Sequence, residues 1–396
     1  MNNKAIIIGC GIAGPVMALA LKRVGIDATI YEAQPMPNDT KGAFLGISPN
    51  GLNVINDFLP LQEILTDYTP GKISFFNAQN KPIGLIDNAH QKDLYGSETV
   101  QLKRGLLNGA LRKAAEQAGI TIKFGKRLIS LSQGHENTVT AFFEDGSQAE
   151  GNLLIGCDGI HSATRSCLFQ DAIKPTYTGL LSTGGFTMIP GLSNLAGSIR
   201  MTFGQRSFFA YALSNKGEVW WFNNISQPDE PSQSELSQLE QAALKEKLLA
   251  LHKHDPYPIA DIIQAAQSIE IYPVYDIPFL PQWHKGRVCL IGDAAHATAP
   301  HIGQGASLAL EDTVVLAKCI RDLPSLTEAF NRFQSLRQER VQTMIRQARK
   351  VGDSKTVPNA FQRFFRDLLL PFFVKMEAKK MDWVYSYKVD WESKIT

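Results

Sequence analysis

The stretch Ala5-Ile6-Ile7-Ile8-Gly9-Cys10-Gly11-Ile12-Ala13-Gly14 decides the fold class of this chain of 396 residues. Its apolar first half predicts a buried strand, its glycines predict a turn, and residues 15–24 predict a helix. In such a unit Gly9 makes the tight turn, Gly11 lets the backbone approach a pyrophosphate, and Gly14 allows close packing of helix on strand. The free N–H groups and the dipole of the helix then face the diphosphate. The stretch predicts a dinucleotide-binding domain of the doubly wound α/β class.

A carboxylate stands where such a site needs one. The next predicted strand, Asp27–Tyr31, ends at Glu32, about 20 residues beyond the glycines, where an acid accepts hydrogen bonds from a ribose diol. A glycine fingerprint alone is weak evidence, because a glycine-rich structural turn has the same pattern. Since strand, helix and acid are all in place, we favour an adenine dinucleotide as the ligand.

The composition limits the classes of function. With 40 basic and 38 acidic residues the net charge is +2, and no long run of either sign favours nucleic-acid binding. We find no run of about 18 apolar residues and no secretory signal pattern, so we expect a cytoplasmic protein without a transmembrane helix. The cysteines lack the spacing of metal ligands, so we expect buried thiols and no metal site. They are Cys10, Cys157, Cys167, Cys289 and Cys319.

Changes of pattern along the chain predict two domains and a tail. Segments in which strand and helix patterns alternate predict one discontinuous cofactor-binding domain, formed by residues 1–72, 98–174 and 280–356. Strand patterns, rich in aromatic residues in their later part, predict an inserted antiparallel β-sheet domain that binds the substrate, formed by residues 73–97 and 175–279. Residues 357–396 predict a C-terminal helical segment.

Two further strand ends carry an aspartate among small residues. Residues 153–165 run from a buried strand through Asp158, flanked by glycines, into a short helix that bears Arg165. This pattern predicts close backbone approach to a ligand, and Asp158 can at the same time cap the helix. A later strand ends at Gly292 and Asp293, whose carboxylate is placed to hold ribityl hydroxyls.

The residues after Asp293 predict a site for a flavin ring. Pro300 is followed by Gly303, Gly305 and Ala306 at the start of a long helix, where small residues leave backbone N–H groups free for the pyrimidine end of an isoalloxazine. That helix dipole favours an anionic reduced flavin. With the glycine fingerprint, these turns predict non-covalent FAD as the cofactor.

Other residues are candidates for the same site. Arg104 opens a predicted helix and is assigned to pyrophosphate oxygens or the ribityl chain, with a solvated arginine as the alternative. Ile12, Ala13 and Leu128 are also expected to contact FAD. His296, in an alanine-rich turn, is predicted to be structural.

These motifs, in this order and spacing, resemble the single-component FAD-dependent aromatic hydroxylases, the p-hydroxybenzoate and salicylate hydroxylase type. The resemblance extends from Ala5 to about Trp391. It implies that the turn from Cys157 to Arg165 serves both FAD and NAD(P)H, and that residues 204–221 belong to a substrate sheet. It further implies that NAD(P)H reduces FAD and that a flavin C4a-hydroperoxide hydroxylates a small aromatic or polycyclic substrate. Ala212 stands where many members have proline.

The catalytic residues and the substrate stay open. Pro300 and His301 are expected in the catalytic loop, and Tyr211 and His301 are the candidates for a base that activates a phenol. The same chemistry could instead inactivate an antibiotic of the tetracycline type. A hypothesis from another class is a flavin-binding scaffold without turnover, which the presence of Arg104, Asp158 and Asp293 disfavours. The sequence leaves NADH or NADPH and the oligomeric state undecided.

Overall fold

The computed structural model describes residues 4–39, 42–70, 72–134, 137–169, 171, 173–192, 198–353, 365, 368–369 and 381–395. Most of the predicted C-terminal helical segment, residues 357–396, lies outside these residues. The part that is described includes the short helix α14 (Asp382–Tyr385), and residues 365, 368 and 369 are also helical.

A mostly parallel sheet forms around the N-terminal stretch. Six described strands follow the order β18-β19-β12-β1-β2-β8, and all neighbours are parallel except β18 and β19. Their apolar centre is buried on both faces, as expected for strands that helices cover on both sides. The strands are β1 (Lys4–Ile8), β2 (Asp27–Tyr31), β8 (Thr121–Lys123), β12 (Leu153–Gly156), β18 (His284–Lys285) and β19 (Val288–Leu290).

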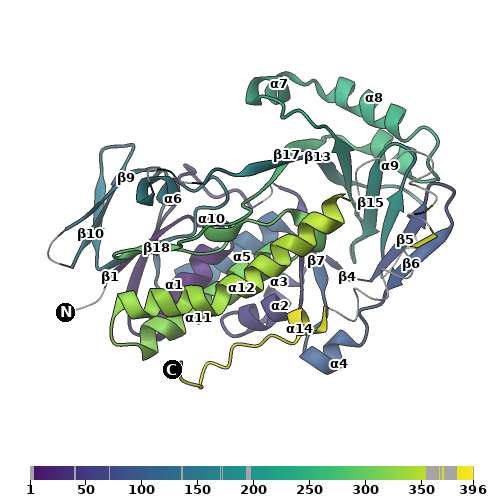
Figure 1. The fold of residues 1–396 in the computed structure, drawn as a ribbon. Coiled ribbons are helices and arrows are strands. Elements are labelled where there is room, and N and C mark those ends of the chain that lie inside the picture. Colours follow the sequence, from purple (N-terminus) through teal and green to yellow (C-terminus); the bar gives the residue numbers. More distant parts are fainter. Residues whose placement is uncertain are drawn as a thin grey trace.

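Long helices cover this sheet. α1 (Ala13–Arg23) follows β1 and packs against α5 (Arg104–Gln117) and α11 (Gly305–Asp322). α12 (Leu326–Asp353) lies along α11, in front of the sheet in Figure 1. The long helix predicted to begin near Gly303 is thus confirmed. The shorter helices are α2 (Pro49–Asn56), α3 (Leu61–Ile64), α4 (Gln91–Tyr95), α6 (Ala163–Leu168), α7 (Gln233–Gln238), α10 (Asp293–His296) and the 3-10 turn η2 (Pro300–Ile302).

A second, mainly antiparallel sheet lies on the other side of the molecule (Figure 1). Seven described strands follow the order β17-β13-β16-β15-β14-β5-β6. β5 and β6 come from residues 73–97, so the prediction that this segment pairs with the later sheet is confirmed. α8 (Gln241–Leu251) and α9 (Ile259–Ala265) pack on one face. The strands are β5 (Ile73–Asn77), β6 (Pro82–Ile86), β13 (Thr176–Thr187), β14 (Ile199–Phe203), β15 (Phe208–Leu213), β16 (Val219–Ser226) and β17 (Glu270–Asp276).

Two small sheets complete the described part. β9 (Leu128–Gln133), β10 (Val139–Phe143) and β11 (Gln148–Gly151) form an antiparallel meander. β3 (Phe44–Ile47), β7 (Val100–Lys103) and β4 (Tyr68–Pro70) form the other. β7 leads directly into α5, and Phe44 of β3 contacts the second large sheet. The fold is therefore doubly wound α/β with an inserted β-sheet, and the small β3-β7-β4 sheet lies where the two parts meet.

Candidate active site

The glycine turn after β1 has the geometry that an adenine dinucleotide requires. Gly9 has a φ of 101°, and a β-carbon there would lie 2.6 Å from the carbonyl oxygen of Cys157. A β-carbon at Gly14 would lie 2.0 Å from the carbonyl oxygen of Gly9. At Gly11, by contrast, no described atom would lie within 4 Å of a β-carbon. The turn is closed on the protein side and open at Gly11, which leaves room for a pyrophosphate at the start of α1.

Glu32 is held beside this turn. Its Oε2 accepts a hydrogen bond of 2.7 Å from the backbone N–H of Cys10, and its Oε1 accepts one of 2.8 Å from Gln34. These bonds orient the carboxylate at the end of β2, next to the glycines. A carboxylate has further lone pairs, so it can also accept hydrogen bonds from ribose hydroxyls. Gly9, Gly14 and Glu32 therefore fit the adenosine half of FAD.

Asp158 is bonded within its own turn. Its carboxylate accepts hydrogen bonds from the hydroxyl of Ser162 at 2.6 Å and from the N–H and the hydroxyl of Thr164 at 2.9 Å each. Burial raises the pKa of this carboxyl. The bond to Thr164 within α6 agrees with the predicted capping role. Contact of Asp158 with a cofactor stays a prediction.

Arg165 connects the Asp158 turn to α10. Its side chain is 2% exposed and donates hydrogen bonds to the carbonyl oxygens of Ile160 at 2.6 Å and Ala294 at 2.8 Å. The second bond fixes the backbone next to Asp293. The structure thus places Arg165 where it orients two turns of the predicted FAD site, and gives it little surface for a ligand of its own.

Asp293 lies close enough to Arg104 for their charges to interact. The side chain of Asp293 is exposed, yet desolvation raises its pKa, and the charges of His296 and Arg104 oppose this shift. A β-carbon at Gly305 would lie 3.8 Å from Oδ1 of Asp293, so the start of α11 lies beside this carboxylate. Three predicted FAD residues, far apart in sequence, therefore lie together.

The loop before α11 carries the remaining cofactor and catalytic candidates. Pro300 is exposed in η2, and Gly303 has a φ of 63°. The first turn of α11, with Gly305 and Ala306, holds no acidic residue, and no described side chain caps it. Its N–H groups are therefore available to an anionic ring edge.

The two histidines of this region differ in their surroundings. His296 is buried, with Nε2 at 2.5 Å from Oδ2 of Asp312, which agrees with the predicted structural role. The ring of His301 lies against α12, because a β-carbon at Gly352 would lie 2.6 Å from its Cδ2. A role of His301 as a base stays a prediction.

Tyr211 does not lie at this site, and its assignment as a possible base needs correction. Its side chain is 2% exposed in the core between the second sheet and α8 and α9, together with Phe209 and Trp221. Burial raises the pKa of Tyr211 to about 12. The hydroxyl is therefore on the face of the sheet that the helices cover, and it stays protonated at neutral pH.

The opposite face, which we call the front face, points toward the cofactor-binding part. It is formed by alternate residues of β13, β15 and β16, and the ring of Phe44 lies 5.8 Å from the rings of Trp220 and Phe222 on it. Its residues include Ser182, Gly184, Phe186, Phe208, Ala210, Ala212, Trp220, Phe222 and Asn224. At its edge, Leu180 and Val274 pack on Ala299, directly before Pro300.

Three other predicted cofactor residues are partly or wholly enclosed. Leu128 is buried in the core at the start of β9, so its side chain is not available to a ligand. Ala13 is buried in the first turn of α1, while Ile12 is half-buried before it. Backbone contact with FAD at these positions stays a prediction.

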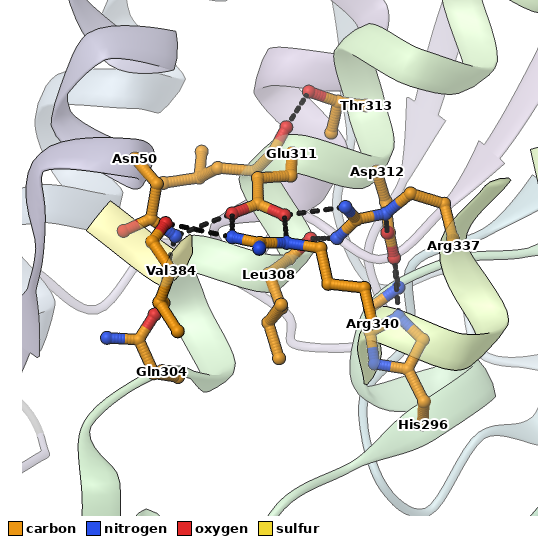
Figure 2. A network of polar contacts seen from close by, with 12 residues as sticks. Asn50, His296, Gln304, Leu308, Glu311, Asp312, Thr313, Arg337, Arg340 and Val384 are labelled. Atoms are coloured by element: carbon orange, nitrogen blue, oxygen red, sulfur yellow. Dashed lines mark hydrogen bonds and ion pairs between the residues drawn. The ribbon is translucent and has the colours of Figure 1, made fainter. Parts of the chain in front are cut away.

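A buried ionic network between α11 and α12 was not predicted from the sequence (Figure 2). Glu311 and Asp312 of α11 are fully buried, and Arg337 of α12 lies between them, 2.6 Å from Glu311 and 2.7 Å from Asp312. Arg340 binds Glu311 through two nitrogens at 2.8 and 2.9 Å. The sequence feature that could have indicated this network is the presence of charged residues within the apolar stripes of two long helices.

The network continues to the residue before α11. Asn50 of α2 donates hydrogen bonds to Glu311 at 2.5 Å and to the side chain of Gln304 at 3.3 Å. Gln304 in turn donates to the hydroxyl of Ser48 at 2.8 Å. All of these polar groups are buried, so the start of α11 is held by paired polar contacts on its inner side.

Comparison with known proteins shows the family to which this chain belongs. The family described as FAD binding domain matches residues 2–347. FAD-dependent urate hydroxylase of Klebsiella pneumoniae is 28% identical over 88% of this chain and 90% of that protein. The 3-amino-4-hydroxybenzoate 2-monooxygenase of Streptomyces cremeus is 27% identical over 91% of this chain and 90% of that protein. The crystal structure of Klebsiella pneumoniae HpxO with FAD and uric acid has a TM-score of 0.85 at 25% identity, covering 96% of each chain.

The helices of the described part give a further observation. None of them combines the length and the apolar composition that crossing a bilayer requires.

From its family match and its nearly full-length similarity to these monooxygenases, the chain belongs to the FAD binding domain family, within the single-component FAD-dependent aromatic hydroxylases.

Proposed function

We propose that this protein uses NAD(P)H and O2 to hydroxylate a small aromatic or polycyclic substrate. The observation that carries the proposal is the contact of Leu180 and Val274 with Ala299. This contact brings the front face of the substrate sheet against the loop that bears Pro300. The similar proteins named above, which act on urate and on an aminohydroxybenzoate, support an aromatic substrate.

FAD, when bound, supplies the redox chemistry by taking a hydride from NAD(P)H and activating O2, so that one oxygen atom enters the substrate and the other leaves as water. The protein binds and orients it. The start of α1 would hold the pyrophosphate, Glu32 would accept from the ribose, and Asp293, near Arg104, would hold the ribityl chain. The start of α11 provides N–H groups that favour negative charge on the ring.

The front face excludes water from the reacting atoms. The ring of Phe44 packs against Trp220 and Phe222, with centroids 5.8 Å apart, so aromatic rings line this part of the site. A dry, apolar surface protects a reactive oxygen species from decomposition in water, which a simple dehydrogenase does not need. The aromatic surface therefore favours oxygenation over dehydrogenation.

The test uses the purified protein incubated with FAD and desalted. Consumption of NADH and NADPH is measured with phenolic acids, N-heteroaromatics and tetracyclines, and the masses of the products are measured by mass spectrometry. We expect a product about 16 mass units heavier than its substrate, and about two units more under 18O2. A product that has lost two hydrogens, or label that enters only from water, contradicts a monooxygenase.

Two other outcomes separate the alternatives. If only tetracyclines stimulate NAD(P)H consumption and gain an oxygen atom, antibiotic inactivation is the favoured activity. A protein that binds FAD but shows neither stimulated NAD(P)H consumption nor product with any compound would favour the non-catalytic flavin-binding scaffold.

A further inference from the structure

Two adjacent asparagines of β16 point to opposite faces of the second sheet. Asn223 points to the face that α8 and α9 cover. Its Nδ2 donates to Oγ of Ser207 at 2.7 Å and to the carbonyl oxygen of Phe208 at 2.8 Å, and it lies 2.7 Å from Nε2 of His252. Its Oδ1 accepts from the hydroxyl of Thr183 at 3.3 Å. Asn223 is thus fully bonded and holds the sheet together.

Asn224 belongs to the front face and differs from its neighbour in its bonding. The residue is 3% exposed, and its Oδ1 is buried without a hydrogen-bond partner among the described residues. Buried carbonyl oxygens of side chains are nearly always paired, because leaving one unpaired destabilises the fold. An unpaired oxygen on the face toward the cofactor therefore indicates a group that a ligand completes.

The surroundings of Asn224 are mainly aromatic. Phe208 of β15 and Ser182 of β13 lie directly opposite it in the strand register, and Phe222 is two residues before it on the same face. Ser182 is two residues from Leu180, which packs on Ala299 beside Pro300. Asn224 and Ser182 thus form a polar pair in an apolar surface, near the loop predicted to hold the flavin ring.

The charge at this face is balanced. Lys103 contacts the front face, with Nζ 4.6 Å from the ring centroid of Phe186 and 5.8 Å from that of Trp220. The same nitrogen lies 2.5 Å from the carboxylate of Glu218 and 3.9 Å from that of Asp67. Because two carboxylates already compensate this cation, it is a poor partner for a carboxylate of the substrate.

Building on the proposed function, we propose that Asn224, with Ser182 beside it, anchors the substrate by accepting a hydrogen bond from it. The substrate is then a neutral planar aromatic ring with an O–H or ring N–H donor, such as a phenol or a lactam of an N-heterocycle. An aromatic carboxylate without such a donor is not the preferred ligand. Asn224 and Ser182 act in binding and specificity, and the redox chemistry remains that of FAD.

The experiment measures binding to the FAD-loaded enzyme, by the change in flavin fluorescence, without turnover. Matched compounds differ only in the donor: phenol and anisole, 2-pyridone and N-methyl-2-pyridone, with benzoate as the carboxylate. We expect each donor compound to bind about tenfold more tightly than its methylated partner, the effect of one hydrogen bond to a buried group. In Asn224→Leu this preference should fall to within about twofold.

Thermal stability distinguishes a binding role from a structural one. Asn224→Leu removes an unpaired buried oxygen, so its melting temperature should stay unchanged or rise. Asn223→Leu is the matched comparison, and it should lower the melting temperature because Ser207 and His252 lose a partner. Ser182→Ala, with Ser226→Ala at the exposed end of the same face as its control, provides a second variant if Asn224→Leu does not fold.

Several results would overturn the inference. They are equal binding of donor and methylated compounds to the wild type, no binding of any donor compound, tightest binding of benzoate, or an unchanged preference in both Asn224→Leu and Ser182→Ala. Oxygen incorporation is measured separately with the same compounds. Oxygenation without donor preference overturns this inference alone, whereas donor preference without oxygenation by any compound overturns the proposed function alone.

Discussion

Oδ2 of Asp312 lies 2.5 Å from Nε2 of His296, and the same oxygen accepts a 2.9 Å hydrogen bond from the backbone N–H of Gly292. One carboxylate on α11 therefore holds both ends of the short α10, which carries Asp293. Although burial opposes ionisation, the charges of His296 and Arg337 hold the pKa of Asp312 below its ordinary value of 3.8. The position of the proposed ribityl-binding carboxylate depends on this buried charge.

Replacing Asp312 by asparagine should therefore reduce both stability and FAD retention. The change leaves Arg337 with one carboxylate in a buried site, so we expect a loss of about 3–5 kcal/mol in the free energy of unfolding. A carboxyl whose folded pKa is depressed stabilises above its unfolded pKa, and this contribution is lost as pH falls below 3.8. The wild type should thus lose stability in acid more steeply than Asp312→Asn, measured by thermal melting at pH 3 to 7.

The control for this prediction is Asp145→Asn. Asp145 is an exposed carboxylate bonded to Lys126 and Ser147, and these hydrogen bonds also lower its pKa. Because Asp145 lies at the surface, its replacement should change the free energy of unfolding by no more than about 0.5 kcal/mol. Equal effects of the two variants would show that the buried position of Asp312 is not what matters.

A second prediction concerns Glu32. Glu32→Ala removes an acceptor from the proposed ribose and releases the N–H groups of Cys10 and Gln34. We expect FAD binding to weaken by about 1.5–3 kcal/mol for each hydrogen bond lost, measured by fluorescence titration of the apoprotein. Glu144→Ala, at an exposed surface carboxylate, is the control. Unchanged FAD affinity in Glu32→Ala would mean that the ribose is held elsewhere.

The fold and the cofactor part of the site were largely predictable, because their signals are local. The strand, the glycines and Glu32 lie within one short segment whose spacing requires a particular turn. Likewise, Asp293 and Gly305 lie at the end of a strand and the start of a helix in a recognisable order. Their proximity to Arg104 follows once these elements belong to one doubly wound domain.

Which face of the second sheet the helices α8 and α9 cover could not be predicted from the sequence. Alternation along β15 shows that Phe209 and Tyr211 share one face, but both faces of this sheet are apolar. Which face meets α8 and α9 depends on contacts with residues far away in sequence. The buried Glu311 and Arg337 were missed for a similar reason, since a charge on a helix normally predicts a solvated face.

A third prediction follows from the position of Tyr211. Tyr211→Phe removes a hydroxyl from the core under α8 and α9, on the opposite side of the sheet from the front face. We expect kcat and KM to change by less than about twofold for any substrate that the enzyme oxygenates. The free energy of unfolding should fall by at most about 1 kcal/mol, the effect of one lost hydrogen bond. A large fall in kcat with unchanged stability would restore Tyr211 as a catalytic candidate.

The last prediction concerns Arg165, which the resemblance to aromatic hydroxylases assigns to a turn shared by FAD and NAD(P)H. Its two hydrogen bonds to Ile160 and Ala294 join the Asp158 turn to the backbone beside Asp293. Arg165→Ala should loosen both turns while leaving the glycine turn and Glu32 in place. We therefore expect reduction of the bound flavin by NAD(P)H, measured by stopped-flow absorbance, to slow more than FAD binding weakens.

Two variants sharpen this test. Arg165→Lys keeps the charge but not the planar fork that reaches two carbonyl oxygens, so it should restore little of the rate. Arg127→Ala, at an exposed arginine on the neighbouring meander, is the control and should reduce at the native rate. Native reduction kinetics in Arg165→Ala would reject a role for this turn in the reductive step, because the connection between Ile160 and Ala294 would then be dispensable.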